Sequence, residues 1–163
     1  MCFKPDTQAL RLQNVNLYCM RHIGVKVLLL DADNTISPWD SPSIAPEVIE
    51  WVETAKSAGF AVLIASNNSL ERVKPLCEQL GIGALPRAGK PLPFRLKKAA
   101  RALGFEPKAC AMIGDQVLTD VIAGNLAGMH TVLLQPIDTT TEYKMTMINR
   151  NLEKVVKKLW KIV

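Results

Sequence analysis

Two carboxylates one residue apart, Asp31 and Asp33, are the first residues of this 163-residue chain whose types and spacing could do chemistry. They follow an apolar run, Val27 to Leu30, that is typical of a central parallel strand covered by helices on both faces. Ligands of open α/β sheets bind in the crevice outside the carboxyl ends of the strands. Two acids there are costly unless a cation or a shared proton relieves them. The sequence therefore predicts a charged binding site at this strand end.

Polar side chains also follow three other apolar stretches: Ser66 and Asn67 after 60–65, Lys90 after the weaker 82–88, and Asp115, with Asp120 downstream, after 109–113. Because the carboxyl ends of parallel strands meet at one edge, we expect these groups to converge with Asp31 and Asp33. The set then holds four carboxylates, one hydroxyl and one ammonium. A hard divalent cation, usually Mg²⁺, offsets such acids. Together with the lysine and the hydroxyl, it suits a phosphoryl group.

Each of these residues has a simpler interpretation when it is taken alone. Ser66 could cap the following helix, and Lys90 could be an ordinary surface lysine. Asp120 could be a first-turn acid that offsets the helix dipole, and the first two acids could belong to a solvated turn. The joint pattern, with every polar group at a strand end, favours a catalytic site.

The elements that must position these residues alternate between strand and helix along the chain. The expected strands are 25–30, 60–65, 82–88, 109–113 and 130–134, and the expected helices lie near 15–21, 47–59, 69–80, 93–103 and 120–127. This order predicts an α/β fold, a three-layer, Rossmann-like parallel sheet of about five strands with helices on both faces. Residues 1–24 are poorly periodic apart from their short helix. Pro75 predicts a kink or a second piece in its helix, and Thr119 predicts a helix cap.

Length and composition indicate a single domain. The chain is 48% hydrophobic, enough for one core over residues 1–163, with the catalytic part at about 25–134. No apolar run approaches the roughly 20 residues of a membrane span, and the N-terminal stretch lacks the apolar core of a secretory signal. The four cysteines show no metal-binding spacing. We therefore expect free thiols in a cytoplasmic protein.

The polar clusters form four motifs in order: Asp31-x-Asp33-x-Thr35, Ser66, Lys90 before a helix, and Gly114-Asp115-x-x-x-x-Asp120. Together they resemble the motifs of the haloacid dehalogenase (HAD) superfamily over about residues 25–134. The resemblance implies a Mg²⁺-dependent hydrolase that works through an aspartyl-phosphate. An acid at position 33 is found in the phosphatases of that superfamily and is not needed by its dehalogenases, so phosphoester hydrolysis is the expected reaction.

The same resemblance implies a role for each residue. Asp31 would attack phosphorus as the nucleophile, and Asp33 would protonate the leaving alkoxide and later activate water. Thr35 would help to orient that acid. The phosphate-binding positions would be Ser66, Asn67, Lys90 and Thr35. The metal positions would be Asp31, Asp33 through its backbone carbonyl, Asp115, and Asp120 directly or through another ligand.

The chain leaves no room for a cap domain over the site. The loop from Asp31 to Pro46 is short and about 23 residues separate Ser66 from Lys90, so the site should be open unless oligomerisation supplies a lid. An open site suits a macromolecular or membrane-bound phosphoester. The segments LDADNT, PWDSP, IASNN, RVKPLCEQLGI, AGKP and GDQVLTDVIAGNLAGMHTVLL resemble subclass IIIA, the capless YqeG/Gep4 type. That group includes phosphatidylglycerophosphate phosphatases, so the resemblance implies this lipid phosphate as substrate.

The C-terminal segment, about 142–162, has the pattern of a basic amphipathic helix. Such a helix could lie on anionic lipid, or it could pack on the sheet with solvated lysines. We therefore expect a phosphorylated partner, while a peripheral contact of this helix with the inner face of a membrane and its packing on the sheet both stay open. No motif predicts a specific nucleic-acid partner.

Two other functions remain open from the sequence. The same chemistry could act on a phosphoprotein, a nucleotide or a sugar phosphate. Alternatively, the chain could be a non-catalytic regulatory domain that only binds phosphate. The presence of Asp31 and Asp33 together with Lys90 and Asp115 argues against the second alternative.

Overall fold

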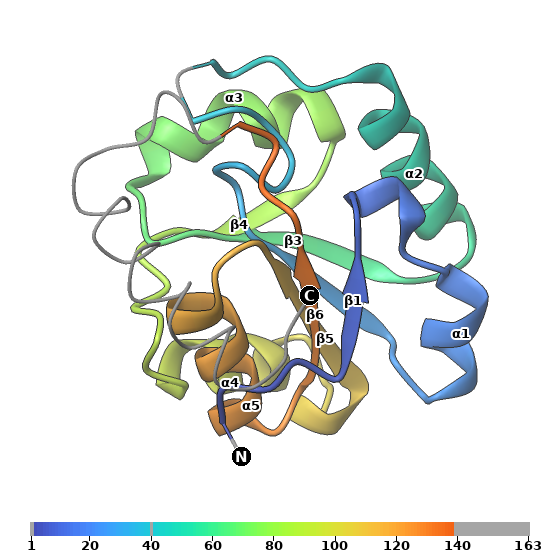
Figure 1. Cartoon of the computed structure of the whole chain (residues 1–163), viewed down its shortest axis with the longest axis vertical. Coiled ribbons are helices and arrows are strands. Elements are labelled where there is room, and N and C mark those ends of the chain that lie inside the picture. The colour runs from blue at the N-terminus through green and yellow to red at the C-terminus, as the bar shows by residue number, and fades with distance from the viewer. Residues whose placement is uncertain (1, 40, 139–163) are drawn as a thin grey trace.

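The computed structural model describes residues 2–39 and 41–138. In this part of the chain, six parallel strands form one sheet in the order β1-β6-β5-β2-β3-β4 (Figure 1). The strands are β1 (Thr7–Ala9), β2 (Val27–Leu30), β3 (Ala61–Ala65), β4 (Gly83–Leu85), β5 (Cys110–Gly114) and β6 (His130–Leu134). The chain adds β3 and β4 on one side of β2, and then β5 and β6 on the other. The strand order therefore reverses between β2 and β5, where ligands of such sheets bind.

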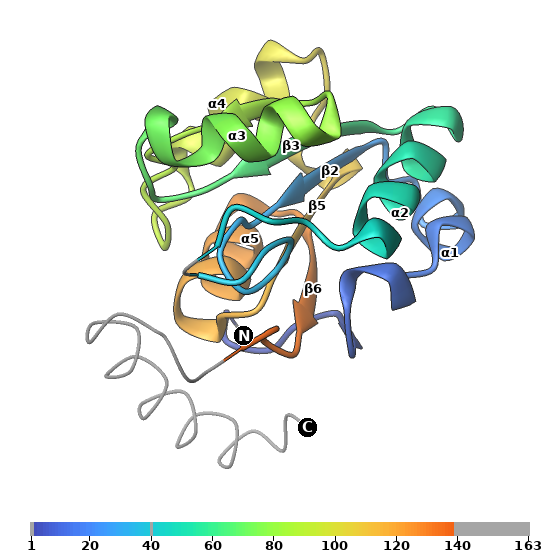
Figure 2. The ribbon, with the colours of Figure 1, turned by 90° about the horizontal axis from the view of Figure 1, so that it is seen from above.

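Helices cover both faces of the sheet. They are α1 (Leu17–His22), α2 (Pro46–Ser57), α3 (Leu70–Leu80), α4 (Phe94–Ala102) and α5 (Ile122–Ala127). Figure 1 shows α2 and α3 above the sheet and α4 and α5 below it, and Figure 2 shows the same elements from above. Shorter turns are the 3-10 helices Leu12–Asn14 and Pro107–Ala109 and the π-helical turn Val117–Val121. The predicted three-layer α/β fold is confirmed.

The central strand β2 divides the core into two layers. All four of its residues are buried, and it pairs with β3 on one side and β5 on the other. Leu28 and Leu30 pack in the layer that α2 and α3 cover, while Val27 and Leu29 pack in the layer under α4 and α5. This alternation follows from the two-residue period of a strand. It explains why the sequence is apolar at every position of β2.

The strand count predicted from the sequence was one too low. The sixth strand, β1, lies in the N-terminal stretch and pairs only with β6. It has three residues, and Gln8 at its centre is exposed. An edge strand with one neighbour needs no apolar run, so periodicity does not reveal it. It is held partly by Asp6, whose N–H donates to the Thr131 carbonyl and whose carboxylate accepts from the Thr131 N–H.

One local prediction about a helix needs correction, and one of the two alternatives for Pro75 is excluded. Thr119 does not cap a helix, because it lies inside the π-helical turn that precedes α5. In this turn the N–H groups of Asp120 and Val121 both donate to the Gln116 carbonyl. Pro75 does not start a second helix, since α3 runs through it from Leu70 to Leu80. The buried side chains of α3 pack on the sheet on both sides of the proline, which holds the helix together.

No cap domain is present in the described residues. Between β2 and α2 the chain makes only a single bridge, from Asp33 to Ser37, and between β3 and α4 it makes only α3 and β4. The same described part contains no helix long and apolar enough to cross a membrane. The basic helix predicted at 142–162 lies outside the described residues.

Candidate active site

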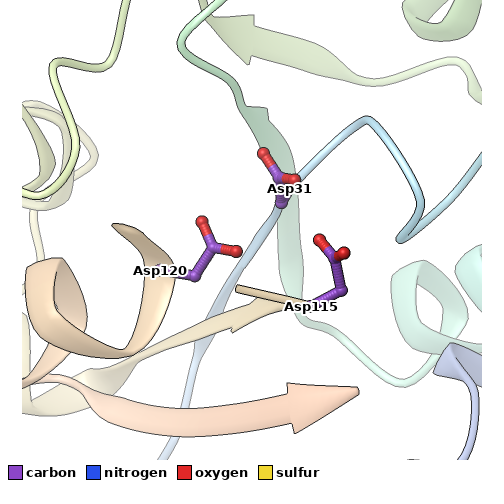
Figure 3. A group of neighbouring side chains, drawn as sticks. All are labelled: Asp31, Asp115 and Asp120. Atoms are coloured by element: carbon purple, nitrogen blue, oxygen red, sulfur yellow. The ribbon is translucent and has the colours of Figure 1, made fainter. Parts of the chain in front are cut away.

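Three buried carboxylates meet at the point where the strand order reverses (Figure 3). Asp31 directly follows β2, Asp115 directly follows β5, and Asp120 lies in the π-helical turn. Each offers a ligand atom, and these three atoms all lie within 4.8 Å of one another. We call these residues the acidic trio.

Backbone hydrogen bonds and one glycine set the positions of the acidic trio. The Asp31 N–H donates to the Ile113 carbonyl at 2.8 Å, which continues the β2–β5 ladder by one residue. The Gln116 N–H donates to Asp120 Oδ2 at 3.1 Å. A Cβ at position 114 would lie 2.2 Å from the same oxygen, so Gly114 leaves the space that the Asp120 carboxylate occupies.

Lys90 brings a positive charge to the acidic trio. Its buried Nζ donates to Asp31 Oδ1 at 2.6 Å, to Asp120 Oδ1 at 2.7 Å and to the Ala65 carbonyl at 2.8 Å. These three bonds use all the donors of an ammonium group. Burial lowers the pKa of Lys90, but the negative charges of Asp120 and Asp31 outweigh burial and raise it above its ordinary range. The ammonium therefore stays charged at neutral pH.

The charge of the acidic trio is only partly offset by Lys90. Burial raises the pKa of Asp31 well above its ordinary value, Lys90 opposes this effect, and the charges of Asp120 and Asp115 raise the pKa further. A further cation at this point would favour the ionised carboxylates. Buried carboxylate oxygens that converge in this way are the donor set that hard divalent cations prefer. The residues present therefore fit a divalent metal ion.

The loops after β3 and β4 hold Lys90 in place. The Asn67 side-chain amide makes two bonds to the Lys90 backbone: Nδ2 donates to the Lys90 carbonyl and Oδ1 accepts from its N–H, both at 2.9 Å. Ser66 is buried, and its Oγ accepts from the Asn68 N–H at 3.1 Å. Ser69, not Ser66, precedes the first residue of α3. Both amide atoms of Asn67 are thus engaged with Lys90, and its predicted contact with phosphate stays a prediction.

Asp33 lies outside the acidic trio. Its carboxylate accepts from the Asn68 Nδ2 and forms an ion pair with Arg72, whose Nη2 lies 3.2 Å from Asp33 Oδ1. The Arg72 guanidinium also donates to the Trp39 carbonyl and lies over the Trp39 ring, 5.5 Å from its centroid. Asp33 is therefore the most solvent-accessible of the four predicted acids, and a separate set of residues orients it.

Thr35 contacts a different acid from the one predicted. Its hydroxyl donates to Asp115 Oδ1 at 3.5 Å, and no bond from it to Asp33 is found among the described residues. Asn34, the residue between the two positions, takes a left-handed conformation with φ of 59°. Asparagine tolerates that region better than most residues. The resulting turn brings the Thr35 hydroxyl within hydrogen-bond distance of Asp115, while the Asp33 carboxylate contacts Asn68 in the loop after β3.

Sequence reasoning missed Asn68, Arg72 and Trp39 as neighbours of the site. Asn68 belongs to the polar run that follows β3, so its place at a strand end was a usable signal. Arg72 lies in the first turn of α3, where a helical pattern marks it only as a surface residue. Its contact with Asp33 joins two residues that are 39 positions apart in the sequence, so it depends on the tertiary structure.

A parallel α/β sheet with this acidic trio and a buried lysine at its switch point suits chemistry on a phosphoryl group. A family model described as a haloacid dehalogenase-like hydrolase matches residues 9–128. The chain belongs to this family. The predicted superfamily and the predicted class of enzyme, a phosphoric monoester hydrolase, are confirmed.

Curated relatives align with most of the chain. The probable phosphatase YqeG of Bacillus subtilis is 37% identical over 93% of this chain and 88% of its own length. Phosphatidylglycerophosphate phosphatase 1 of Chlamydomonas reinhardtii is 29% identical over 92% of this chain, which spans 59% of that protein. The mitochondrial phosphatidylglycerophosphatase GEP4 of Saccharomyces cerevisiae is 27% identical over 70% of this chain and 69% of its own length. The predicted YqeG/Gep4-like subclass is confirmed.

Solved structures share the fold. An uncharacterised protein from Listeria monocytogenes superimposes with a TM-score of 0.59 over 82% of this chain and 99% of its own, at 19% identity. The 3-deoxy-D-manno-octulosonate 8-phosphate phosphatase of Moraxella catarrhalis, solved with magnesium and phosphate ions, gives a TM-score of 0.58 over 71% of both chains, at 21% identity.

Proposed function

We propose that this protein hydrolyses the terminal phosphomonoester of phosphatidylglycerophosphate, releasing phosphatidylglycerol and inorganic phosphate. The observation that carries this substrate is the similarity, over 92% and 96% of this chain, to two proteins named phosphatidylglycerophosphate phosphatase 1. A site without a cap domain supports it, because a phosphate attached to a bilayer must reach the catalytic residues without being enclosed.

In the first step, an Asp31 carboxylate oxygen attacks the phosphorus of the monoester. A P–O bond to Asp31 forms, and the P–O bond to the glycerol oxygen breaks. Asp33 gives its proton to the departing alkoxide as general acid. The products of this step are the free lipid alcohol and a phosphoryl group on Asp31.

In the second step, Asp33, now ionised, takes a proton from a water molecule. The water oxygen attacks the same phosphorus, and the bond to the Asp31 oxygen breaks. Inorganic phosphate leaves, Asp31 is again a carboxylate, and Asp33 is again protonated. The two acids can take these different roles because Asp31 is buried beside Lys90, whereas Asp33 is partly exposed beside Arg72 of α3.

Lys90 and Ser66 hold the transferring phosphoryl group in this proposal. The Lys90 ammonium already lies 2.6 Å from the attacking carboxylate, so it stands where negative charge on phosphoryl oxygens must be stabilised. Ser66 ends the neighbouring strand and offers its hydroxyl as a donor. Asn67 keeps Lys90 in place through its two backbone bonds.

We propose Mg²⁺ as the metal, held by Asp31, Asp115 and Asp120 and by the backbone carbonyl of Asp33. When bound, it would neutralise phosphoryl charge and orient the phosphate toward Asp31. Thr35 would hold Asp115 in its orientation through the hydroxyl contact described above. Gly114 would keep open the space for Asp120.

The proposal is tested by a substrate panel with and without vesicles. The wild-type protein with Mg²⁺ should release phosphate from phosphatidylglycerophosphate in mixed micelles with a higher kcat/KM than from phosphoglycolate, a sugar phosphate or a nucleotide. Asp31→Asn should lower that rate by more than about a thousandfold, since it removes the nucleophile. Glu106→Gln, an exposed acid far from the site, is the matched control.

Two outcomes would contradict the proposal in different ways. If the soluble esters are turned over faster than the lipid, the proposed chemistry stands and the proposed substrate is wrong. Phosphate binding without release of phosphate from any ester would indicate a non-catalytic phosphate-binding domain.

A further inference from the structure

Three large apolar side chains are exposed beside the proposed active site. Leu70 is 53% exposed at the start of α3, Phe94 is 71% exposed at the start of α4, and Leu92 is 58% exposed two residues before α4. All three lie in the segments that follow β3 and β4, at the same edge of the sheet as Asp31 and Lys90. Apolar side chains exposed together in this way commonly mark an interaction surface.

The two segments that carry these side chains are joined by backbone hydrogen bonds. The Arg87 N–H donates to the Asn68 carbonyl and the Ala88 N–H donates to the Ser66 carbonyl, both at 2.8 Å. The paired bonds between Asn67 and Lys90 add a third connection. The two segments that carry the exposed leucines and the phenylalanine are therefore held together at one edge of the sheet.

Basic side chains accompany the apolar ones. Arg87, which follows β4, and Arg95, in the first turn of α4, are both exposed. The Arg95 side chain lies close to the loop at Gly89. Two acids lie nearby: Glu71, on which the positive charge of Arg87 acts, and Asp33, which contacts Asn68 of the same segment. We call Leu70, Arg87, Leu92, Phe94 and Arg95 the apolar–basic rim.

The positive charge continues down α4 from the apolar–basic rim. This helix has no acidic residue, and Lys97, Lys98 and Arg101 follow Arg95 along it. Phe94, Lys97, Lys98 and Arg101 line one shallow hollow, so they share a face of the helix. Arg101 lies roughly 10 Å along the axis from Phe94, slightly more than the Debye length of about 8 Å at physiological salt. The cations on this face can therefore add electrostatic attraction to an anionic surface that Phe94 contacts, with the attraction weakening toward Arg101.

We propose that the apolar–basic rim docks on the surface of an anionic lipid bilayer, so that a lipid phosphate reaches Asp31 while its acyl chains stay in the membrane. This inference rests on the proposed lipid substrate. Apolar side chains that enter the acyl boundary, with cations at the level of the headgroups, are the arrangement that binds anionic membranes. Both kinds of side chain occur together at the edge where the substrate must enter, and this favours a bilayer over a protein or nucleic-acid partner.

The test compares vesicle binding and two kinds of turnover in the full-length protein. One variant combines Leu70→Ser, Leu92→Ser and Phe94→Ser, and a second combines Arg87→Gln and Arg95→Gln. The matched controls are Ile23→Ser with Leu126→Ser and Lys26→Gln with Lys108→Gln, which change exposed residues at the opposite edge of the sheet. Every variant keeps residues 139–163, so any affinity of that segment for lipid is the same in all of them.

Both rim variants should bind phosphatidylglycerol vesicles more weakly than wild type. We expect at least a tenfold loss for the apolar variant and about a 25-fold loss for the arginine variant, about fivefold for each basic side chain. The loss in the arginine variant should shrink at high salt. Turnover of p-nitrophenyl phosphate should be unchanged, while turnover of phosphatidylglycerophosphate in vesicles should fall with binding. The controls should behave as wild type.

The outcomes separate this inference from the proposed function. If wild type hydrolyses phosphatidylglycerophosphate in vesicles and both rim variants do so equally well, the docking surface is wrong and the substrate stands. If wild type hydrolyses only soluble esters, the proposed function itself fails. If the rim variants change the oligomeric state and keep vesicle binding, the rim is an interface between copies of the chain, and the membrane proposal is refuted.

Discussion

At the scale of single residues, the two acids of the first motif have different surroundings. Asp31 is buried beside Lys90, whereas Asp33 contacts Asn68 and Arg72. The side chain of Arg72 is 38% exposed, so its ion pair contributes little to the stability of the fold. In the proposed mechanism the geometry of this pair matters more than its energy, because Asp33 would act as general acid and must be aimed at the leaving oxygen. We therefore interpret Arg72 as a positioning residue for Asp33.

Arg72→Ala should lower kcat for the hydrolysis of esters whose leaving group needs a proton from the general acid. The expected loss of kcat is about tenfold for an alkyl phosphate and within twofold for p-nitrophenyl phosphate, whose leaving group needs no proton. KM and the urea-unfolding free energy should change little. Lys74→Ala, which removes an exposed ion pair with Glu78 on the same helix, is the control. An equal loss with both esters would show that Arg72 acts on phosphate binding or folding instead of on Asp33.

At the scale of elements, the edge pair β1–β6 couples the N-terminal segment to the sheet through His130. This histidine hydrogen-bonds to the Thr7 hydroxyl at 2.9 Å, and its Nδ1 lies 3.8 Å from Asp6 Oδ2. Burial lowers the pKa of His130 below its ordinary value, with Asp6 opposing the change. The folded chain therefore takes up this proton less readily than the unfolded chain does.

The stability of the protein should fall as the pH drops below the ordinary histidine pKa of 6.5, toward the lower pKa of folded His130. The contribution of neutral His130 to the free energy of unfolding is fully present above pH 6.5, where the side chain is neutral in both the folded and the unfolded state. His130→Gln should reduce the difference between the urea-unfolding free energies measured at about pH 8 and about pH 5.5. The exposed His22→Gln is the control. An identical difference in wild type and His130→Gln would contradict the assignment.

At the scale of the whole molecule, the two halves of the sheet each supply part of the acidic trio. Asp31 belongs to the half built on β2 and β3, and Asp115 and Asp120 belong to the half built on β5 and β6. A divalent ion between them would join the halves, and an ion that binds only the folded state stabilises it. The metal is thus expected to act on folding as well as on catalysis.

Mg²⁺ should raise the Tm of the wild-type protein. At about 100 times its Kd it should add about 2.7 kcal/mol, which corresponds to roughly 5–10 °C for a domain of this size. Asp115→Asn should abolish this increase, whereas Glu106→Gln should retain it. A Tm that rises equally in Asp115→Asn would place the ion elsewhere. Calorimetric titration with Mg²⁺ in the absence of substrate provides a readout that does not depend on activity.

The sequence alone determined the fold class and the positions of the acids. The predicted strands account for five of the six, and three of them (β2, β3 and β5) are continuous apolar runs, because a parallel strand buried on both faces must be apolar throughout. The polar residues that end those runs had to share one edge, since parallel strands all point the same way. The resemblance of the motifs then indicated the superfamily before any geometry was known. The role of each site residue stays a prediction.

Only the tertiary structure decided the details that depend on contacts between distant segments. These include the edge strand β1, the bond from Thr35 to Asp115, the ion pair of Asp33 with Arg72, and the apolar–basic rim. None of them has a local pattern, because a short edge strand needs no apolar run and an exposed leucine or arginine looks the same on any surface. The sequence placed two acids at the end of one strand. The fold gave them separate environments, with one acid buried against a lysine and the other held by an arginine from a neighbouring helix.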